Sequence, residues 1–430
     1  MPRHPVFLFV LAVWVCGLAQ ADSDSRQRIR TARDLSKQGS EAIPKLAPML
    51  SDPDSAVRIE AVKAIVDIDG PASVGPLVQA TRDTDVEVQI RAADGLVNYY
   101  LPGYVRRGGL TASISRVGTA VKSKFTDTND LVVPAYTQVK PEVVEALGHL
   151  VRNGGSMDCR ANAARAAGIL RGQAAMPDLI DALHSKDDQV MYESLIALQK
   201  IKDPSAGPRM MFLLRDLDPK VQLAAIDTAG LLRTHEALPA LRGVLVDADD
   251  AKVKRAALSA IAMIPDPGSR DLYQRYIHDR DDGLRAAAAE GFARLKNPAD
   301  EHLLANELKN DQRRPSQLAE SFALVMLGHT EYTEQGALRF LVNTLNSAAW
   351  KGVAQAYLIE AARETAVRRT LERALKPATK DEKIQLLQIL AASGDTQTEP
   401  YLDELSRDSD PDVASAALSA SRTLKARLPN

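Results

Sequence analysis

The side chains that most often carry catalysis or bind metals are sparse in this sequence of 430 residues. Seven histidines are spread along the chain, and none forms an HExxH motif or a pair four residues apart. The one His-Glu pair, His235-Glu236, cannot complete a metal site alone. The glycine patterns of P-loops and Rossmann folds and the nucleophile elbow are also missing from the sequence. We therefore predict no catalytic residue, no metal, no cofactor and no small-molecule substrate.

Two cysteines, Cys16 and Cys159, are too few for a disulfide framework. Cys159 stands where other copies of a repeated pattern have valine, which favours a small buried side chain over a nucleophile. Aspartate pairs such as Asp52/Asp54 resemble calcium or glycosidase carboxylates at first sight. They recur once in each copy of the pattern, so we interpret them as helix caps.

Composition narrows the class of protein. The 54 basic and 56 acidic residues nearly cancel, which argues against a protein that wraps nucleic acid. About 45% of residues are hydrophobic and only 4% are aromatic. Such a chain folds, and it builds its core from small and aliphatic side chains, as packed helices do.

The N-terminal residues 1–21 read as a secretory signal. Arg3 supplies a positive charge, Val6 to Val15 form an apolar run, and Ala19-Gln20-Ala21 is a small-x-small cleavage site. The apolar run is shorter than a membrane span needs. We therefore predict cleavage after Ala21 and a mature chain that is periplasmic or secreted.

The rest of the chain is a repeat with a period near 31 residues. Val57 and Val88 are 31 apart, and the later anchors are 31, 31, 32 and 31 apart. Those later anchors are Cys159, Val190, Val221, Val253 and Leu284. Each period predicts two helices, of which the second is better marked: Asp52-Pro53-Asp54 begins one and Asp69-Gly70-Pro71 ends it. Alanines recur on the apolar stripe, at Ala61, Ala92, Ala163, Ala225, Ala257 and Ala288.

The pattern Asp-x-Asp-x-x-Val-Arg-x-x-Ala-x-x-Ala resembles the short HEAT-like repeats of bacteria, of the phycobilisome-lyase type. The resemblance covers about residues 40–430 and implies an all-α, right-handed α-solenoid of about eleven two-helix repeats. It also implies a surface that binds other proteins, although some members are lyases or metal enzymes. As in similar repeats, we expect Arg58, Arg160 and Arg285 to form a ladder with the aspartates of neighbouring repeats.

One segment breaks the period, because Val88 and Cys159 are 71 residues apart. The predicted organisation is a cap helix at 22–39, repeats at 40–98, an insertion at 99–138, and repeats at 139–430 with a C-terminal cap. The insertion holds four of the ten tyrosines, and from Tyr99 to Thr126 it has five basic residues and no acidic one. Apolar residues spaced 4, 3, 4 and 4 apart from Leu110 to Phe125 predict an amphipathic helix within it. The predicted partner-binding residues are Tyr99, Tyr100, Tyr104, Arg106, Arg107, Arg116, Lys122, Lys124 and Phe125.

Several functions stay open at this point. The insertion and the concave face of the solenoid could bind another protein, which makes the chain an exported, non-enzymatic scaffold. The insertion could instead cover the groove of its own solenoid, or its basic helix could contact an anionic membrane surface. An enzymatic alternative is a lyase or isomerase-like protein that acts on a protein-bound ligand. The basic runs Arg313-Arg314 and Arg368-Arg369 with Arg373 have acidic neighbours and are interpreted as solvated faces.

Overall fold

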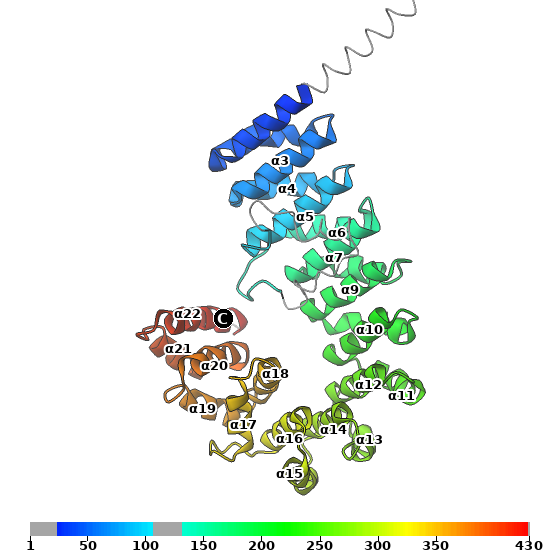
Figure 1. Ribbon diagram of the computed structural model, residues 1–430, viewed down its shortest axis with the longest axis vertical. Coiled ribbons are helices and arrows are strands. Elements are labelled where there is room, and N and C mark those ends of the chain that lie inside the picture. Colours follow the sequence, from blue (N-terminus) through cyan, green and yellow to red (C-terminus); the bar gives the residue numbers. More distant parts are fainter. Residues whose placement is uncertain (1–23, 106–130, 429–430) are drawn as a thin grey trace, which may run out of the picture. The chain divides into compact units, whose positions relative to one another are not determined.

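The computed structural model describes residues 24–105 and 131–428, and all regular elements within them are helices (Figure 1). The chain divides into two compact units. Unit 1 comprises Met1–Val133 and Gln138–Asp203, and unit 2 comprises Pro134–Thr137 and Pro204–Asn430. The two units are described separately.

Unit 1 begins with a helix at 24–36 and continues with four helix pairs. The first helix of a pair often begins with a 3-10 turn and is shorter than the second, except that α6 and α7 both have 13 residues. The first helices are η1 Gly39–Ala42 with α2 Ile43–Leu46 and η2 Ala47–Ser51, then η3 Pro71–Ser73 with α4 Val74–Ala80, α6 Pro141–Asn153, and η6 Gln173–Ala175 with α8 Met176–Ala182. The second helices are α3 Ser55–Ile68, α5 Val86–Tyr100, α7 Met157–Ile169 and α9 Asp188–Ile201.

Unit 2 contains seven further pairs in its described residues. Its first helices are η7 Pro204–Arg215, η8 His235–Ala237 with α11 Leu238–Asp247, η9 Pro267–Ser269 with α13 Arg270–Tyr276, η10 Pro298–Asp300 with α15 Glu301–Asn310, α17 Ala337–Thr344, α19 Thr365–Ala374, and η11 Thr396–Thr398 with α21 Glu399–Leu405. Its second helices are α10 Pro219–Leu231, α12 Ala251–Met263, α14 Asp282–Leu295, α16 Arg314–Met326, α18 Lys351–Ala361, α20 Lys380–Ser393 and α22 Pro411–Arg427.

Each second helix packs on the second helix of the next pair, and the first helices form another layer. The contacts run from α3 through α5 and α7 to α9 in unit 1, and from α10 through the even-numbered helices to α22 in unit 2. Figure 1 shows α11, α13 and α15 on the other side of this layer in unit 2. The described residues thus contain eleven pairs, and the predicted α-solenoid of about eleven two-helix repeats is confirmed.

Small side chains set the spacing between neighbouring second helices. Ala61, Ala92 and Ala163 are fully buried on the apolar stripe, as their recurrence predicted. At Gly168 an added Cβ would lie 2.6 Å from the Cα of Ala197 on the next second helix, so the two backbones nearly touch. Because each pair buries its apolar face only against its neighbours, this close approach supplies the core.

The interpretation of the recurring aspartate pairs as helix caps is correct for the second member of each pair and wrong for the first. Asp54 is the N-cap of α3, whereas Asp52 accepts a hydrogen bond from the Asp54 N–H at 2.9 Å. Asp85 accepts hydrogen bonds from the backbone N–H groups of Glu87 and Val88, and the same arrangement begins α10, α14 and α22. The expected ladder also exists in part. The Arg58 guanidinium donates to Asp83 of the next repeat at 2.8 and 2.9 Å.

The ladder prediction was correct for Arg285, which pairs with Asp311 at 2.7 Å, and wrong for Arg160. Arg160 donates to the Val151 carbonyl of its own repeat, at 2.8 Å. The reason is that the next repeat has Ser185 where other repeats have the accepting aspartate, and this serine hydroxyl accepts from the Asp187 N–H at 3.1 Å instead.

One repeat departs from the alanine rule. On α16, Glu320 stands at the helix position that holds Ala288 on α14, and it is fully buried. Neither carboxylate oxygen has a hydrogen-bond partner among the described residues. Burial, together with the negative charges of Asp311 and Glu307, raises the pKa of Glu320 to about 8, against a weaker opposing effect of Arg285.

This buried carboxyl predicts a stability that falls as the pH rises. Glutamate in an unfolded chain has a pKa of about 4.3. Between about pH 4.3 and about pH 8 the folded chain therefore holds a proton on Glu320 that the unfolded chain has lost. Each pH unit in this window lowers the free energy of unfolding by about 1.4 kcal/mol. Glu320→Gln should remove this dependence and raise the stability at pH 8, measured by urea denaturation from pH 5 to 9.

The exposed Glu145→Gln on α6 is the matched control, and it should leave the pH profile unchanged. A Glu320→Gln variant whose profile follows the wild type would show that Glu320 is ionised in the folded protein.

Candidate protein-binding site

The described ends of the insertion are fixed to unit 1. Tyr99 and Tyr100 form the last turn of α5, with their rings edge to face at 4.8 Å between centroids. The Tyr100 hydroxyl accepts a hydrogen bond from the backbone N–H of Lys140, at 3.0 Å, just before α6 begins. The two ends of the insertion are thereby joined, and burial raises the pKa of the Tyr100 hydroxyl.

Two further contacts anchor the same segment. The Val105 N–H donates to the Asn98 side-chain oxygen at 2.9 Å, and Tyr104 lies within electrostatic range of Arg165. On the returning side, the Val133 N–H donates to the Ile169 carbonyl at the end of α7, and the Val133 side chain is buried. The insertion therefore leaves from the C-terminal end of α5 and returns at the C-terminal end of α7.

The remaining predicted partner-binding residues lie outside the residues that the structure describes. They are Arg106, Arg107, Arg116, Lys122, Lys124 and Phe125, together with the amphipathic helix expected from Leu110 to Phe125. Beside them, Leu131 and Tyr136 are the exposed large apolar side chains of the described flank, at 40% and 38%.

A polar row lies on α5, α7 and α9 between the two anchors, made of Asp94, Asn162, Arg165 and Glu193. All four side chains are buried. Asn162 donates to Asp94 at 3.0 Å, and Arg165 donates through Nε to Glu193 at 3.1 Å and through Nη2 to the other oxygen. Gln189 completes the shell of Glu193 with a hydrogen bond of 2.8 Å. Each charged side chain of the row thus meets an opposite charge or a hydrogen-bond donor, which offsets part of the cost of its burial.

Unit 2 has its own network of ion pairs at the C-terminal ends of its second helices. Arg294 in the last turn of α14 pairs with Glu360 on α18 at 2.8 Å and with Glu290 at 3.1 Å. Arg233 after α10 reaches the same Glu360 at 3.4 Å. Burial alone would raise the pKa of Glu360, but the hydrogen bonds and charge of Arg294 lower it. Lys296 and Glu364 form another pair across the same helices.

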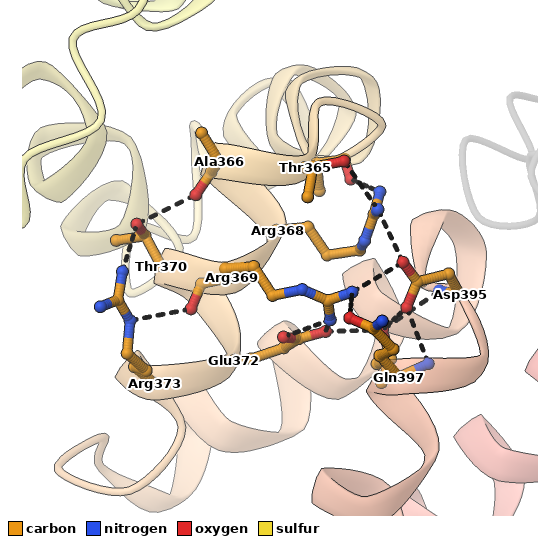
Figure 2. Close-up of polar contacts among 12 residues, drawn as sticks. Thr365, Ala366, Arg368, Arg369, Thr370, Glu372, Arg373, Asp395 and Gln397 are labelled. Carbon is orange, nitrogen blue, oxygen red and sulfur yellow. Dashed lines mark hydrogen bonds and ion pairs between the residues drawn. The ribbon is translucent and has the colours of Figure 1, made fainter.

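A third polar cluster corrects the interpretation of α19 as a solvated face. Arg368 is buried, and it donates to the carbonyls of Ala362 and Arg363 and to Asp395. Arg369 donates to the buried Glu372 and, at 2.8 Å, to the same Asp395 (Figure 2). The acid that both share is 26 residues downstream of Arg369, in the loop before η11, and the neighbouring residues in the sequence gave no sign of it.

The described residues offer little for catalysis. Cys159 is buried, its thiol donates to the Gln89 side-chain oxygen at 3.2 Å, and burial raises its pKa to about 12. This is the small buried side chain that the repeat position predicted. In the described part of the chain, no group of three or more histidine, cysteine, aspartate or glutamate side chains could hold a metal ion. Across the same residues, no helix is both long and apolar enough to span a membrane.

Comparison with protein families gives one match, to a model of HEAT repeats. It covers residues 13–97, 176–262 and 207–293, so two of the three matched stretches overlap. A comparison with curated protein sequences finds no match.

Several solved structures share helical repeats with the chain at low identity. The complex of CpcE and CpcF of phycocyanin lyase from Nostoc sp. PCC7120 is 19% identical, over 64% of this chain and 94% of that one, with a TM-score of 0.38. Importin beta is 14% identical over 91% of this chain and 58% of its own, with a TM-score of 0.43. Kap121p is 12% identical over 89% and 45%, with a TM-score of 0.37.

The sequence contained a sign of the polar row that the prediction missed. Asp94 on α5 and Arg165 on α7 stand nine residues after their N-caps, and Asn162 and Glu193 stand six residues after theirs. Charged or amide side chains thus recur six or nine residues after the N-caps of three successive second helices, and this recurrence indicates an interaction between repeats.

The pair Arg165–Glu193 gives a test of this row. Glu193→Gln should lower the free energy of unfolding by roughly 3 kcal/mol, because it leaves the Arg165 charge buried without its carboxylate. Urea denaturation at pH 7 measures the loss. The double variant Arg165→Met with Glu193→Leu should lose less free energy of unfolding than the single variants Arg165→Met and Glu193→Leu lose together. Additive costs would mean that the two side chains do not depend on each other.

Proposed function

Because the chain is a HEAT-like repeat protein, we propose that it is a non-enzymatic scaffold that binds another protein through the 99–138 insertion and the adjoining face of unit 1. One observation carries this proposal: the segment that breaks the repeat is tied at both described ends to α5, α7 and the start of α6. Its flanks are thus held in place before any partner arrives. Preorganisation of this kind reduces the entropy that binding costs.

The composition of the insertion fits a protein contact. Tyrosine and arginine are the residues that dominate binding energy at interfaces, and both are concentrated here. The polar row beside the insertion is buried and hydrogen-bonded within unit 1, so we assign the contact to the tyrosines and bases of the insertion and not to the row. Leu131 and Tyr136 add exposed apolar surface at the returning end.

The lyase alternative has less support from this chain. CpcE and CpcF belong to a phycocyanin lyase, but their likeness to this chain is too low to transfer an activity. The one cysteine in the described residues has its thiol held protonated by burial, which makes it a poor nucleophile. We also propose that the protein is exported and cleaved after Ala21, on the evidence of the N-terminal sequence. N-terminal sequencing of the protein from a periplasmic fraction tests the cleavage.

Replacement of residues 106–130 by a short glycine-serine linker should leave the fold intact and abolish partner capture. The anchors at Asn98, Tyr100 and Val133 all lie outside the replaced residues. The measurement is a pull-down from envelope extract with the chain 22–430 as bait, followed by titration of the captured protein in purified form. Circular dichroism and the melting temperature verify the fold of both baits.

A second variant separates protein capture from membrane attachment. Neutralisation of Arg106, Arg107, Arg116, Lys122 and Lys124 to glutamine keeps the length of the insertion and removes its charge. Under the proposal, the wild type does not sediment with anionic vesicles, whereas a purified partner binds the wild type and not the linker variant. Sedimentation with vesicles that is lost in the neutralised variant, with no protein captured, would replace the scaffold by a peripheral membrane protein.

A further inference from the structure

A cavity with a volume of about 600 Å³ lies in the last two repeats of unit 2. It is a groove between α19 and α21, and the loop before α22 and Lys383 of α20 also line it. Leu375 forms its buried floor, and Tyr401 and Leu405 are half-buried on its wall. This volume is within the range of sites that hold a few side chains of a ligand.

The charges around this groove are unbalanced. Arg373, Lys376 and Arg407 are exposed, and none of them has an ion pair among the residues that the structure describes. Lys383 is neutralised by Asp408 at 2.9 Å, and the lining Glu372 is neutralised by Arg369. Glu404 is then the one unpaired acid of the lining in the described residues. The groove therefore carries an excess of positive charge on a chain whose net charge is −2.

Arg373 is held in position without being neutralised. Its Nε donates to the Arg369 carbonyl at 3.1 Å, and its Nη2 donates to the Thr370 hydroxyl at 3.3 Å. Figure 2 shows that Arg368 and Arg369 extend to one side, toward Asp395, whereas Arg373 lies on the other side of the helix. A fixed guanidinium loses little side-chain entropy when it binds a carboxylate.

A comparable groove at the first two repeats shows that this excess is not a general property of the fold. That groove has about 380 Å³ and lies at the same place between first helices. Arg58 in its lining is paired with Asp83, and Arg82 is the one exposed base of the lining that has no acid in the described residues. The C-terminal groove is larger than the N-terminal one, and its lining has three bases without an acid where the N-terminal lining has one.

We propose that the α19–α21 groove binds an extended acidic segment of a partner protein, with an apolar side chain of the segment over Leu375, Tyr401 and Leu405. The free bases attract carboxylates, and the apolar wall distinguishes a peptide from a simple anion. Arg294 and Lys296 at the C-terminal end of α14 are paired with acids, whereas three bases without an acid among the described residues gather at this groove. The inference rests on the proposed scaffold function and gives it a second contact.

The test uses the whole chain 22–430 and a labelled nine-residue peptide that alternates aspartate with leucine, followed by fluorescence anisotropy at low salt. The double variant Lys376→Glu with Arg407→Glu should weaken binding at least tenfold, and Arg373→Gln should weaken it several-fold. The matched control, Arg209→Glu with Lys252→Glu, changes the same charge at exposed residues elsewhere in unit 2 and should stay within twofold. Circular dichroism verifies that every variant is folded.

Two control ligands define the specificity. A peptide with glycine in place of leucine should bind at least tenfold more weakly, and a peptide with lysine in place of aspartate should not bind. Equal binding of the glycine peptide, or binding of the leucine peptide that the double variant leaves unchanged, would overturn the inference. The inference would also be overturned if the wild-type chain bound anionic vesicles and did not bind the leucine peptide. The linker variant of residues 106–130 should bind the peptide normally, so that a failure of the insertion hypothesis is distinguishable from a failure at this groove.

Discussion

A pair of short helices cannot bury its own apolar face, and this constraint governs the whole chain. Each second helix must pack against the next, and the distance between them is set by alanine or glycine at the contact, as at Ala163 and at Gly168 against Ala197. Side chains at these closest contacts are therefore small, and larger ones pack beside them, as Phe322 of α16 does against Tyr357 of α18. The aspartate caps and the Arg58–Asp83 ladder occupy the loop edge for this reason.

The same constraint decides how charges are treated. A charge near the packed layer loses water and needs an opposite charge from a neighbouring repeat. Arg165 obtains one from Glu193, and Arg294 obtains one from Glu360 two second helices away. Glu320 is the exception, because it stands at an alanine position and its carboxyl oxygens have no hydrogen-bond partner in the described residues. In the folded chain it is the protonated acid at neutral pH.

Local patterns in the sequence predicted what depends on local structure. The period gave the number of helix pairs, and the aspartates gave the starts of second helices, because caps and turns involve residues close in the chain. The errors have a common cause. Arg160 was expected to join the ladder, but the next repeat has Ser185 at the position of the accepting aspartate. Arg368 was interpreted as solvated, although it donates a hydrogen bond to Asp395. Both outcomes depend on a residue from another repeat, which a motif within one repeat does not include.

The polar row shows where this limit affects function. Asp94 and Asn162 are 68 residues apart and meet only because the insertion between them leaves the stack and returns to it. Since the row is buried and hydrogen-bonded inside unit 1, we assign recognition on that unit to the insertion. In unit 2, Arg294 and Lys296 at the C-terminal end of α14 are likewise paired. Bases without an acid remain at the loop edge, where the packing constraint is absent and a side chain such as Arg407 is free to serve a ligand.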